Sequence, residues 1–214
     1  MTSLVEDLLL LARLDEGREL DHDPVDLSLL LIDALSDAHA AGPDHTWSIQ
    51  LPEEPVEVSG DAPRLHQVVM NLLANARVHT PEGTKVIASL AVDTAAQEAV
   101  VTVADDGPGI PEELQSTLFE RFARGDSSRN RATGSTGLGL AIVQAVVEAH
   151  GGAVAVVSEP GSTVFTVRLP LAPLDPPVGA APAAAAPADS GTVETADTSE
   201  TDSDPAETHG AVRE

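Results

Sequence analysis

The sequence predicts an α/β domain followed by an acidic tail. Stretches with apolar residues at helical spacing alternate with short β-branched stretches, which is typical of a mixed domain. Apolar residues make up 42% of the 214 residues and aromatic residues only 2%, so Leu, Val, Ile and Ala must form the core. From Pro170 onward Pro, Ala, Ser, Thr and acidic residues dominate, and this change in composition separates the tail from the domain.

The charge of the chain excludes several kinds of partner. It has 11 basic and 35 acidic residues, and the formal net charge of −24 repels nucleic acid and anionic membrane surfaces. There is no cysteine, and no apolar stretch has the roughly 18 residues that span a membrane. We therefore expect no nucleic-acid partner, no membrane contact by this chain, and a cytoplasmic location.

The first predicted helix is unusually apolar. Apolar residues follow a helical spacing from Leu4 to Leu20, until Asp23-Pro24 ends the pattern. The four consecutive leucines Leu8 to Leu11 need a partner surface. The helix either packs on its own domain or forms half of a helical bundle between two chains.

The next part of the chain is divided by helix start and stop signals. Asp26 is predicted to cap a second helix that continues to Ala41. Residues 47–51 and 56–58 are predicted to form two short strands. Asp61 then begins a third helix with a broad apolar face.

The third helix carries Asn71 and Asn75, which lie one turn apart on the same side. Asparagine is a poor helix former, so two of them in an apolar helix require an explanation. They are either core amides bonded to nearby loops or the polar part of a pocket wall. In the second case their oxygens accept from metal-bound water or coordinate a hard cation such as Mg²⁺.

A β-hairpin is predicted over residues 85–92 and 98–105, which are rich in β-branched residues and separated by a polar turn. Asp105 ends the second strand and precedes a tight turn that contains Gly107 and Gly109. A carboxylate in this position either binds a ligand or belongs to an ordinary turn.

Residues 123–136 form the one basic patch of an acidic protein. They follow Phe119 and Phe122 and include Arg124. A polar, glycine-containing segment of this length is typical of a mobile lid, and its arginines suit an anionic ligand.

A glycine-rich loop leads into the last predicted helix. Gly134, Gly137 and Gly139 allow close backbone approach to a ligand, and a helix N-terminus offers unpaired N–H groups. The loop is therefore predicted to bind a phosphate group, although glycines alone also mark simple turns. His150 is predicted to end this helix rather than to bind a ligand.

Two strands at residues 153–158 and 163–169 complete the predicted domain. The residues that follow include nine acidic side chains and one Arg. Such a segment buries too little apolar area to offset the entropy of ordering, so we expect a disordered tail, with a docking segment as the alternative.

The order of these motifs resembles one family. The motifs resemble those of the catalytic and ATP-binding domain of sensor histidine kinases, within the superfamily shared with gyrase, Hsp90 and MutL. They are, in chain order, Asn71-x-x-x-Asn75, Asp105-x-Gly107-x-Gly109, the pair Phe119 and Phe122, Gly137-x-Gly139 and Gly161-Ser162-Thr163. The resemblance implies a two-layer α/β sandwich of the Bergerat type, with helices on one face of a mixed sheet. It further implies a partial dimerisation helix over residues 1–22, the catalytic domain over 23–170 and the tail over 171–214.

For single residues, the resemblance implies a Mg-ATP site. Asn75 is expected to bind Mg²⁺ and Asn71 to face the phosphates, while Asn71 and Arg124 assist the transfer. Asp105 is expected to bind the amino group of adenine. The remaining nucleotide-binding residues that it implies are His79, Gly107, Gly109, Phe122, Gly134, Gly137, Leu138, Gly139 and Thr163.

The resemblance implies an ATP-dependent protein histidine kinase module of two-component signalling, with a response regulator as a partner. The phosphoacceptor motif of the family, a His followed by an acid on the first dimerisation helix, is missing. We therefore expect the acceptor histidine on a dimerisation domain supplied in trans or by a longer precursor. The chain is then either a free cytoplasmic protein or the cytoplasmic part of a membrane-bound sensor.

The sequence also departs from the family pattern. Val78 replaces a frequent Lys three residues after Asn75, and Ser135 stands at a usual glycine position. Two alternatives are a nucleotide-binding regulator without productive phosphotransfer and an anti-sigma-type serine kinase, although the helix at Leu4 to Leu14 argues against the second. A gyrase-like ATPase requires a Glu as water base at the position of Asn71, so efficient hydrolysis is not expected.

Overall fold

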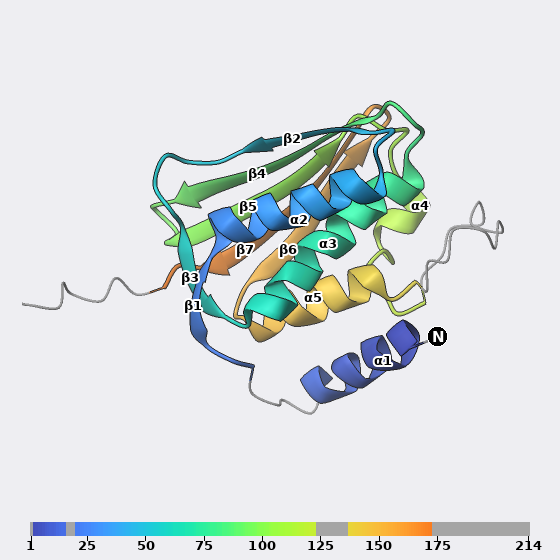
Figure 1. Ribbon diagram of the computed structural model, residues 1–214. Helices are drawn as coiled ribbons and strands as arrows, with labels where there is room; N and C mark the ends of the chain where they lie inside the picture. Colours follow the sequence, from blue (N-terminus) through green and yellow to red (C-terminus); the bar gives the residue numbers. More distant parts are fainter. Residues whose placement is uncertain (1, 16–19, 123–136, 173–214) are drawn as a thin grey trace, which may run out of the picture. The chain divides into compact units, whose positions relative to one another are not determined.

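The computed structural model describes residues 2–15, 20–122 and 137–172. A five-stranded mixed sheet with the strand order β2-β4-β5-β7-β6 forms one layer (Figure 1). β2 and β4 are parallel, and the other neighbours are antiparallel. The strands are β2 (Thr46–Gln50), β4 (Lys85–Asp93), β5 (Glu98–Asp105), β6 (Ala153–Glu159) and β7 (Ser162–Pro170).

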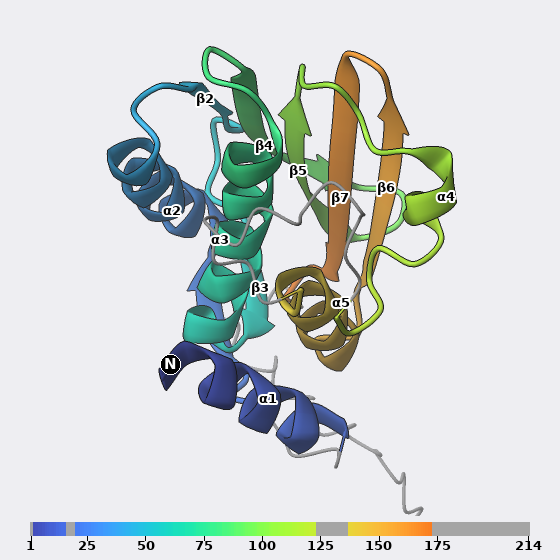
Figure 2. The same ribbon diagram turned by 90° about the vertical axis from the view of Figure 1, so that its right-hand side faces the viewer.

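Three helices form the second layer and cover one face of this sheet (Figures 1 and 2). They are α2 (Leu27–Ala41), α3 (Ala62–His79) and α5 (Gly139–Ala149). The predicted two-layer α/β sandwich with a mixed sheet is thereby confirmed.

The core lies between the two layers. Alternate residues of β5, namely Ala99, Val101 and Val103, are buried beneath the helices, as the pleat of a strand with one covered face requires. Leucines from the helices and Phe165 from β7 fill the remaining space. An aliphatic core was the expectation from the composition.

Both predicted helix caps are present. The side chain of Asp26 accepts from the N–H groups of Ser28 and Leu29 at the start of α2. The Asp61 side chain accepts from the Arg64 N–H, 3.1 Å away, at the start of α3. These bonds satisfy N–H groups that the first turn of a helix leaves without partners.

Asp23 and Pro24, interpreted from the sequence only as a helix break, lie in a strand. β1 (Asp23–Asp26) pairs antiparallel with β3 (Glu57–Gly60) in a separate two-stranded sheet. Asp and Pro are poor strand formers, and tertiary contact overrides that preference here because Val25 and Val58 pair directly and are both buried.

The apolar first helix is shorter than predicted. α1 spans Thr2–Asp15, and Leu20 lies outside it. Leu10 and Leu11 are buried in the core cluster, and Asp7 accepts a hydrogen bond from the Gln67 side chain of α3 at 3.3 Å. Leu14 is partly buried against the core, whereas Leu4, Val5, Leu8 and Leu9 remain between 39% and 57% exposed, so the domain covers only part of this helix.

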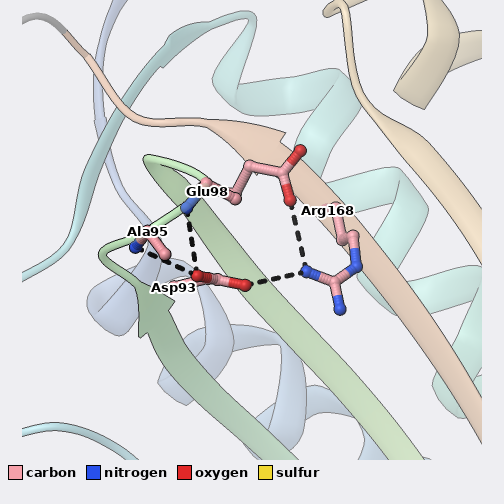
Figure 3. A network of polar contacts seen from close by, with 5 residues as sticks. Asp93, Ala95, Glu98 and Arg168 are labelled. Carbon is pink, nitrogen blue, oxygen red and sulfur yellow. Dashed lines mark hydrogen bonds and ion pairs between the residues drawn. The ribbon is translucent and has the colours of Figure 1, made fainter.

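The predicted hairpin of β4 and β5 is confirmed, and a polar network closes it (Figure 3). Asp93 accepts from the backbone N–H groups of Ala95 and Ala96 in the turn. Arg168 of β7 lies between Asp93 and Glu98, with nitrogen to oxygen distances of 3.5 and 3.2 Å. The network therefore joins the turn to the next strand of the sheet.

Two further differences from the sequence prediction concern short features. The short helix α4 (Glu112–Gln115) was not predicted, because four residues are too few to show a helical period. The last helix begins at Gly139 itself, so this glycine belongs to the first turn rather than to the preceding loop. No helix in the described part of the chain is long and apolar enough to cross a membrane.

Candidate nucleotide site

Asp105 is buried at the end of β5, with 8% of its surface exposed. Its Oδ1 accepts from the N–H group of Gly107 at 3.0 Å. A carboxylate has two oxygens, so this bond leaves the second oxygen for a ligand that carries an amine.

Burial raises the pKa of Asp105, and the charge of Asp106 acts in the same direction, whereas the hydrogen bond from Gly107 lowers it. Asp106 itself is exposed and accepts from the Lys85 backbone N–H at 2.7 Å, so it supports the start of β4. Of the two adjacent acids, only Asp105 is buried in the way that a ligand-binding carboxylate requires.

The turn after Asp105 needs both of its glycines. A Cβ at Gly107 would lie 2.5 Å from Cγ2 of Thr80. Gly109 has a φ of +82°, and a Cβ there would lie 2.6 Å from the carbonyl oxygen of Glu159. The backbone of this turn therefore lies directly against the end of α3 on one side and the β6–β7 turn on the other.

Thr163 is the cross-strand neighbour of Asp105, because β5 and β7 pair at these residues. It is 3% exposed, and its hydroxyl lies 2.9 Å from the hydroxyl of Ser158. Ser158 also accepts from the N–H group of Ile110 at 2.8 Å. The predicted residue Thr163 is thus part of the hydrogen-bond network beneath the Asp105 turn.

Asn71 lies at the opposite end of the candidate site. Its Nδ2 donates to the carbonyl oxygen of Gly139 at 3.1 Å, which brings the middle of α3 to the first residue of α5. The first bond within α5 joins the N–H group of Ile142 to the carbonyl of Leu138 at 2.9 Å. The N–H groups of residues 139–141 therefore take no part in the helix's own hydrogen bonds and suit an anion.

α3 connects the two ends of the candidate site. Thr80, which directly follows α3, lies against Gly107. Asn71 is nine residues before Thr80, which corresponds to about 13 Å along the helix axis. Asn75 is half-buried one turn after Asn71, between these ends, and His79 is the exposed last residue of α3. The structure thus arranges the predicted asparagine, aspartate and glycine motifs along one helix.

The backbone at Phe122 is strained and lies next to the glycine loop. Phe122 has a φ of +63°, which is unusual for a residue with a side chain, and its N–H group donates to the carbonyl of Gly137 at 2.9 Å. Gly137 has a φ of +69°, as predicted for a flexible glycine. Arg124 and Gly134 lie outside the described residues.

An open hollow of about 670 Å³ lies beside this region, between α5 and the segment after α4. Asn75 and Asp105 do not line it, so it is separate from the residues predicted to bind adenine and metal. Its lining residues are Ser116, Phe119, Glu120, Arg121 and Gln144.

Sequence reasoning did not identify two residues that shape the candidate site. Thr80 packs against Gly107, and its hydroxyl lies 3.0 Å from Nε2 of His45. Ser158 joins the Ile110 backbone to Thr163. A hydroxyl residue after a helix or in a strand is too common to predict such a contact without the tertiary structure.

His22 is followed by Asp23, yet this pair does not lie on a helix. Asp23 begins β1, and the carbonyl of His22 accepts from the hydroxyl of Ser59 at 3.2 Å. The pair therefore lacks the helical setting of the family's phosphoacceptor motif. Within residues 2–15, 20–122 and 137–172, no group of three or more His, Cys, Asp or Glu side chains is placed to hold a metal ion.

Comparison with known proteins identifies the relatives of this chain. It is 64% identical over 171 residues to the "Probable sensor histidine kinase TcrY" of Mycobacterium tuberculosis, covering 80% of this chain and 36% of TcrY. It is 48% identical over 174 residues to the sensor histidine kinase TrcS of the same organism, covering 80% of this chain and 34% of TrcS. The chain thus spans about a third of the length of these relatives.

Solved structures have the same fold. The mycobacterial sensor histidine kinase MprB is 33% identical with a TM-score of 0.63, covering 71% of this chain and 100% of the MprB chain. Full-length ShkA in complex with AMPPNP is 31% identical with a TM-score of 0.66, covering 79% of this chain and 35% of ShkA. Residues 60–173 match the family described as "Histidine kinase-, DNA gyrase B-, and HSP90-like ATPase". With more than half of its residues matched, the chain belongs to this ATPase family.

Proposed function

We propose that the chain is the nucleotide-binding and phosphoryl-donating module of a two-component histidine kinase. It binds Mg-ATP and donates the γ-phosphate to a histidine on a dimerisation domain, from which the phosphate passes to a response regulator. The observation that carries this proposal is the position of α3, which has Asn71 bonded to Gly139, the first residue of α5, and its other end against the Asp105 turn.

Each end of the candidate site suits a different part of ATP. The second oxygen of Asp105 accepts from the amino group of adenine, and Gly107, Gly109 and Thr163 support the base. The N–H groups of Leu138 and Gly139, together with Gly137, bind the phosphates, because a helix N-terminus attracts anions. Phe122 and His79 border the site, and the family resemblance adds Gly134 and Arg124, which lie outside the described residues.

The donor set suits a magnesium ion that is held mainly by the nucleotide. Mg²⁺ prefers oxygen ligands and is usually bound through one or two protein groups together with substrate phosphates. The half-buried Asn75 offers one amide oxygen, and the described residues provide no acidic cluster that would bind the ion alone. When bound, Mg²⁺ neutralises charge on the phosphates.

Phosphoryl transfer of this kind needs positioning and charge neutralisation rather than a protein nucleophile. Asn71 positions the phosphates, and Arg124 neutralises charge that develops on the γ-phosphate. The aligned residues cover only 36% and 34% of these two sensor kinases, so the acceptor histidine and any sensor domain are assigned to regions outside this chain.

A direct test measures Mg-dependent binding of an ATP analogue. Asn75→Ala should abolish the effect of Mg²⁺ on affinity, and Gln67→Ala provides the control, because it removes an amide from the same helix at a place where Gln67 bonds to Arg64 and Asp7. Unchanged affinity in Asn75→Ala would remove the assignment of this residue.

The second test uses labelled ATP. The chain should transfer label to a separate dimerisation domain that carries an acceptor histidine. Label on the isolated chain would contradict the proposed external acceptor, and His22→Asn would then show whether the His22-Asp23 pair had received it.

A further inference from the structure

His150 is a buried histidine with a partner on each ring nitrogen. Its Nδ1 lies 2.7 Å from the carbonyl oxygen of Val146, and its Nε2 lies 3.0 Å from the backbone nitrogen of Asp61. His150 is the C-cap of α5, whereas Asp61 is the N-cap of α3. The imidazole therefore connects the end of one helix to the beginning of the other.

These contacts define one tautomer. The backbone N–H group of Asp61 can only donate, so Nε2 must be the acceptor and Nδ1 must carry the proton. The Nδ1–H group then donates to Val146. Both ring nitrogens are satisfied only in this neutral form, and a side chain without an acceptor at the Nε2 position would leave the Asp61 N–H group without this bond.

The surroundings leave the ring little freedom. A Cβ at Gly60 would lie 2.7 Å from Cδ2 of His150. On the other side, Gly151 has a φ of +72°, and the N–H groups of Gly151 and Gly152 donate to Glu148 and Val147. These bonds form a Schellman motif that fixes the C-terminal end of α5.

α3 and α5 are thus joined by two side-chain hydrogen bonds, one near each end of their contact. Asn71 bonds to Gly139 at one end, and His150 bonds to Asp61 at the other. Asp61 and Asn71 are ten residues apart at α3, and Gly139 and His150 are eleven residues apart at α5. Both separations correspond to about 15 to 17 Å along the helix axis. The helices are antiparallel neighbours (Figures 1 and 2), so the two bonds together fix how far α5 can slide along α3.

We propose that His150 is a positioning residue of the nucleotide site. Through its bond to Asp61 it sets the position of α5 along α3, and hence the place of Gly139 beside Asn71. The effect of His150 on nucleotide binding rests on the proposed function. The placement of one helix along the other is a property of the free protein as well.

Two amide variants separate the two bonds of the ring. In His150→Gln the amide oxygen reaches the position of Nε2 and accepts from Asp61. In His150→Asn the shorter amide reaches only the position of Nδ1, so it retains a donor to Val146 and loses the bond to Asp61. Both variants remove the ring, and they differ in the contact that the proposal requires.

The variants are compared in the full chain by binding of a non-hydrolysable ATP analogue, by thermal unfolding and by the amide resonances of Gly139 and the Asn71 side chain. His150→Asn should bind the analogue at least about fivefold more weakly and shift both resonances, because the partly buried N–H group of Asp61 loses its partner. His150→Gln should bind within about twofold of the wild type and leave the resonances in place. Val25→Ala, in β1, serves as a control that loses stability without affecting the α3–α5 contact.

Wild-type affinity and unmoved resonances in His150→Asn would overturn the proposal, as would equal effects of Asn and Gln. Failure of the wild-type chain to bind the analogue would instead refute the proposed function. The resonances of Gly139 and Asn71 would still decide whether His150 positions α5. In the wild type, imidazole nitrogen spectra should show a protonated Nδ1 on His150, and a protonated Nε2 would also overturn the proposal.

Discussion

Two adjacent acids at the end of β5 perform different tasks. Asp106 accepts a hydrogen bond from the backbone N–H group of Lys85 and supports the start of β4. Asp105 is buried, and one of its oxygens accepts from the N–H group of Gly107. A buried carboxylate is unfavourable for the free protein, and such groups concentrate at sites that bind ligands.

Asp105→Asn should therefore raise the free energy of unfolding of the nucleotide-free protein while weakening nucleotide binding. Because burial raises the pKa of Asp105 in the folded state, the wild type loses stability as pH rises from the unfolded value of 3.8 through the folded value. The difference in free energy of unfolding between Asp105→Asn and the wild type should be absent below pH 3.8 and reach a plateau above the pKa of Asp105 in the folded state. Denaturant unfolding across this pH range measures it.

Asp37→Asn is the control for that experiment, because it removes the same charge from an exposed position of α2. A gain of equal size in the control would show that relief of the net charge of −24, rather than the burial of Asp105, is responsible.

The glycines provide a second test at single residues. Gly83 and Gly109 have nearly equal φ values of +85° and +82°, but a Cβ at Gly83 has no neighbour within 4 Å, whereas one at Gly109 meets the backbone of Glu159. Gly83→Ala should lower the free energy of unfolding by about 1 kcal/mol. Gly109→Ala should lower it by about 3 kcal/mol, because backbone overlap is added to the strain. Similar losses would refute the close contact.

At the scale of the elements, the sheet derives its stability from its buried face rather than from the ion pairs at its end. Arg168 and its partners Asp93 and Glu98 are between 32% and 44% exposed, so water screens them (Figure 3). Phe165 lies three residues earlier on the same strand and is 1% exposed.

Arg168→Ala should accordingly lower the free energy of unfolding by less than about 1 kcal/mol. Phe165→Ala should lower it by about 3 to 5 kcal/mol, because it leaves a cavity in the core. Urea unfolding of both variants tests the comparison. A larger loss in Arg168→Ala would mean that the polar network closes the hairpin more strongly than its exposure indicates.

Elements with strong local signals were predictable from the sequence. The caps Asp26 and Asp61 marked α2 and α3, and β-branched runs marked the β4–β5 hairpin. β1 was missed because its stability comes from pairing with β3, a partner more than thirty residues away in the chain. Such pairing depends on tertiary contact, for which local preference is a weak guide.

In the candidate site, too, residues with a local sequence signal differ from contacts that depend on the tertiary structure. The sequence singles out Asn71, Asp105 and Gly139 as candidates, because their types and order are unusual, and their roles in binding stay predictions. The contacts of Thr80 with Gly107 and of His150 with Asp61 were not predictable, because each joins segments whose proximity only the fold determines.

For the whole molecule, the core cluster ends before the predicted tail, and the matched family region ends within the first few residues of that tail. All residues of the core cluster precede Pro170, and the family match extends to residue 173. A chain that ends at Ala172 should keep its thermal midpoint and its affinity for nucleotide. It loses nine acidic residues and one Arg, so it should leave an anion exchanger at lower salt. A lower midpoint would indicate that the tail packs on the domain.

The hydrogen bond between Phe122 and Gly137 has a consequence for how this protein can vary. Phe122 and Gly137 are neighbours in space although fourteen residues separate them in the sequence, so the bond holds the described parts of the chain together at that point. A change in the number of residues between Phe122 and Gly137 should therefore leave this bond, and with it the start of α5, in place.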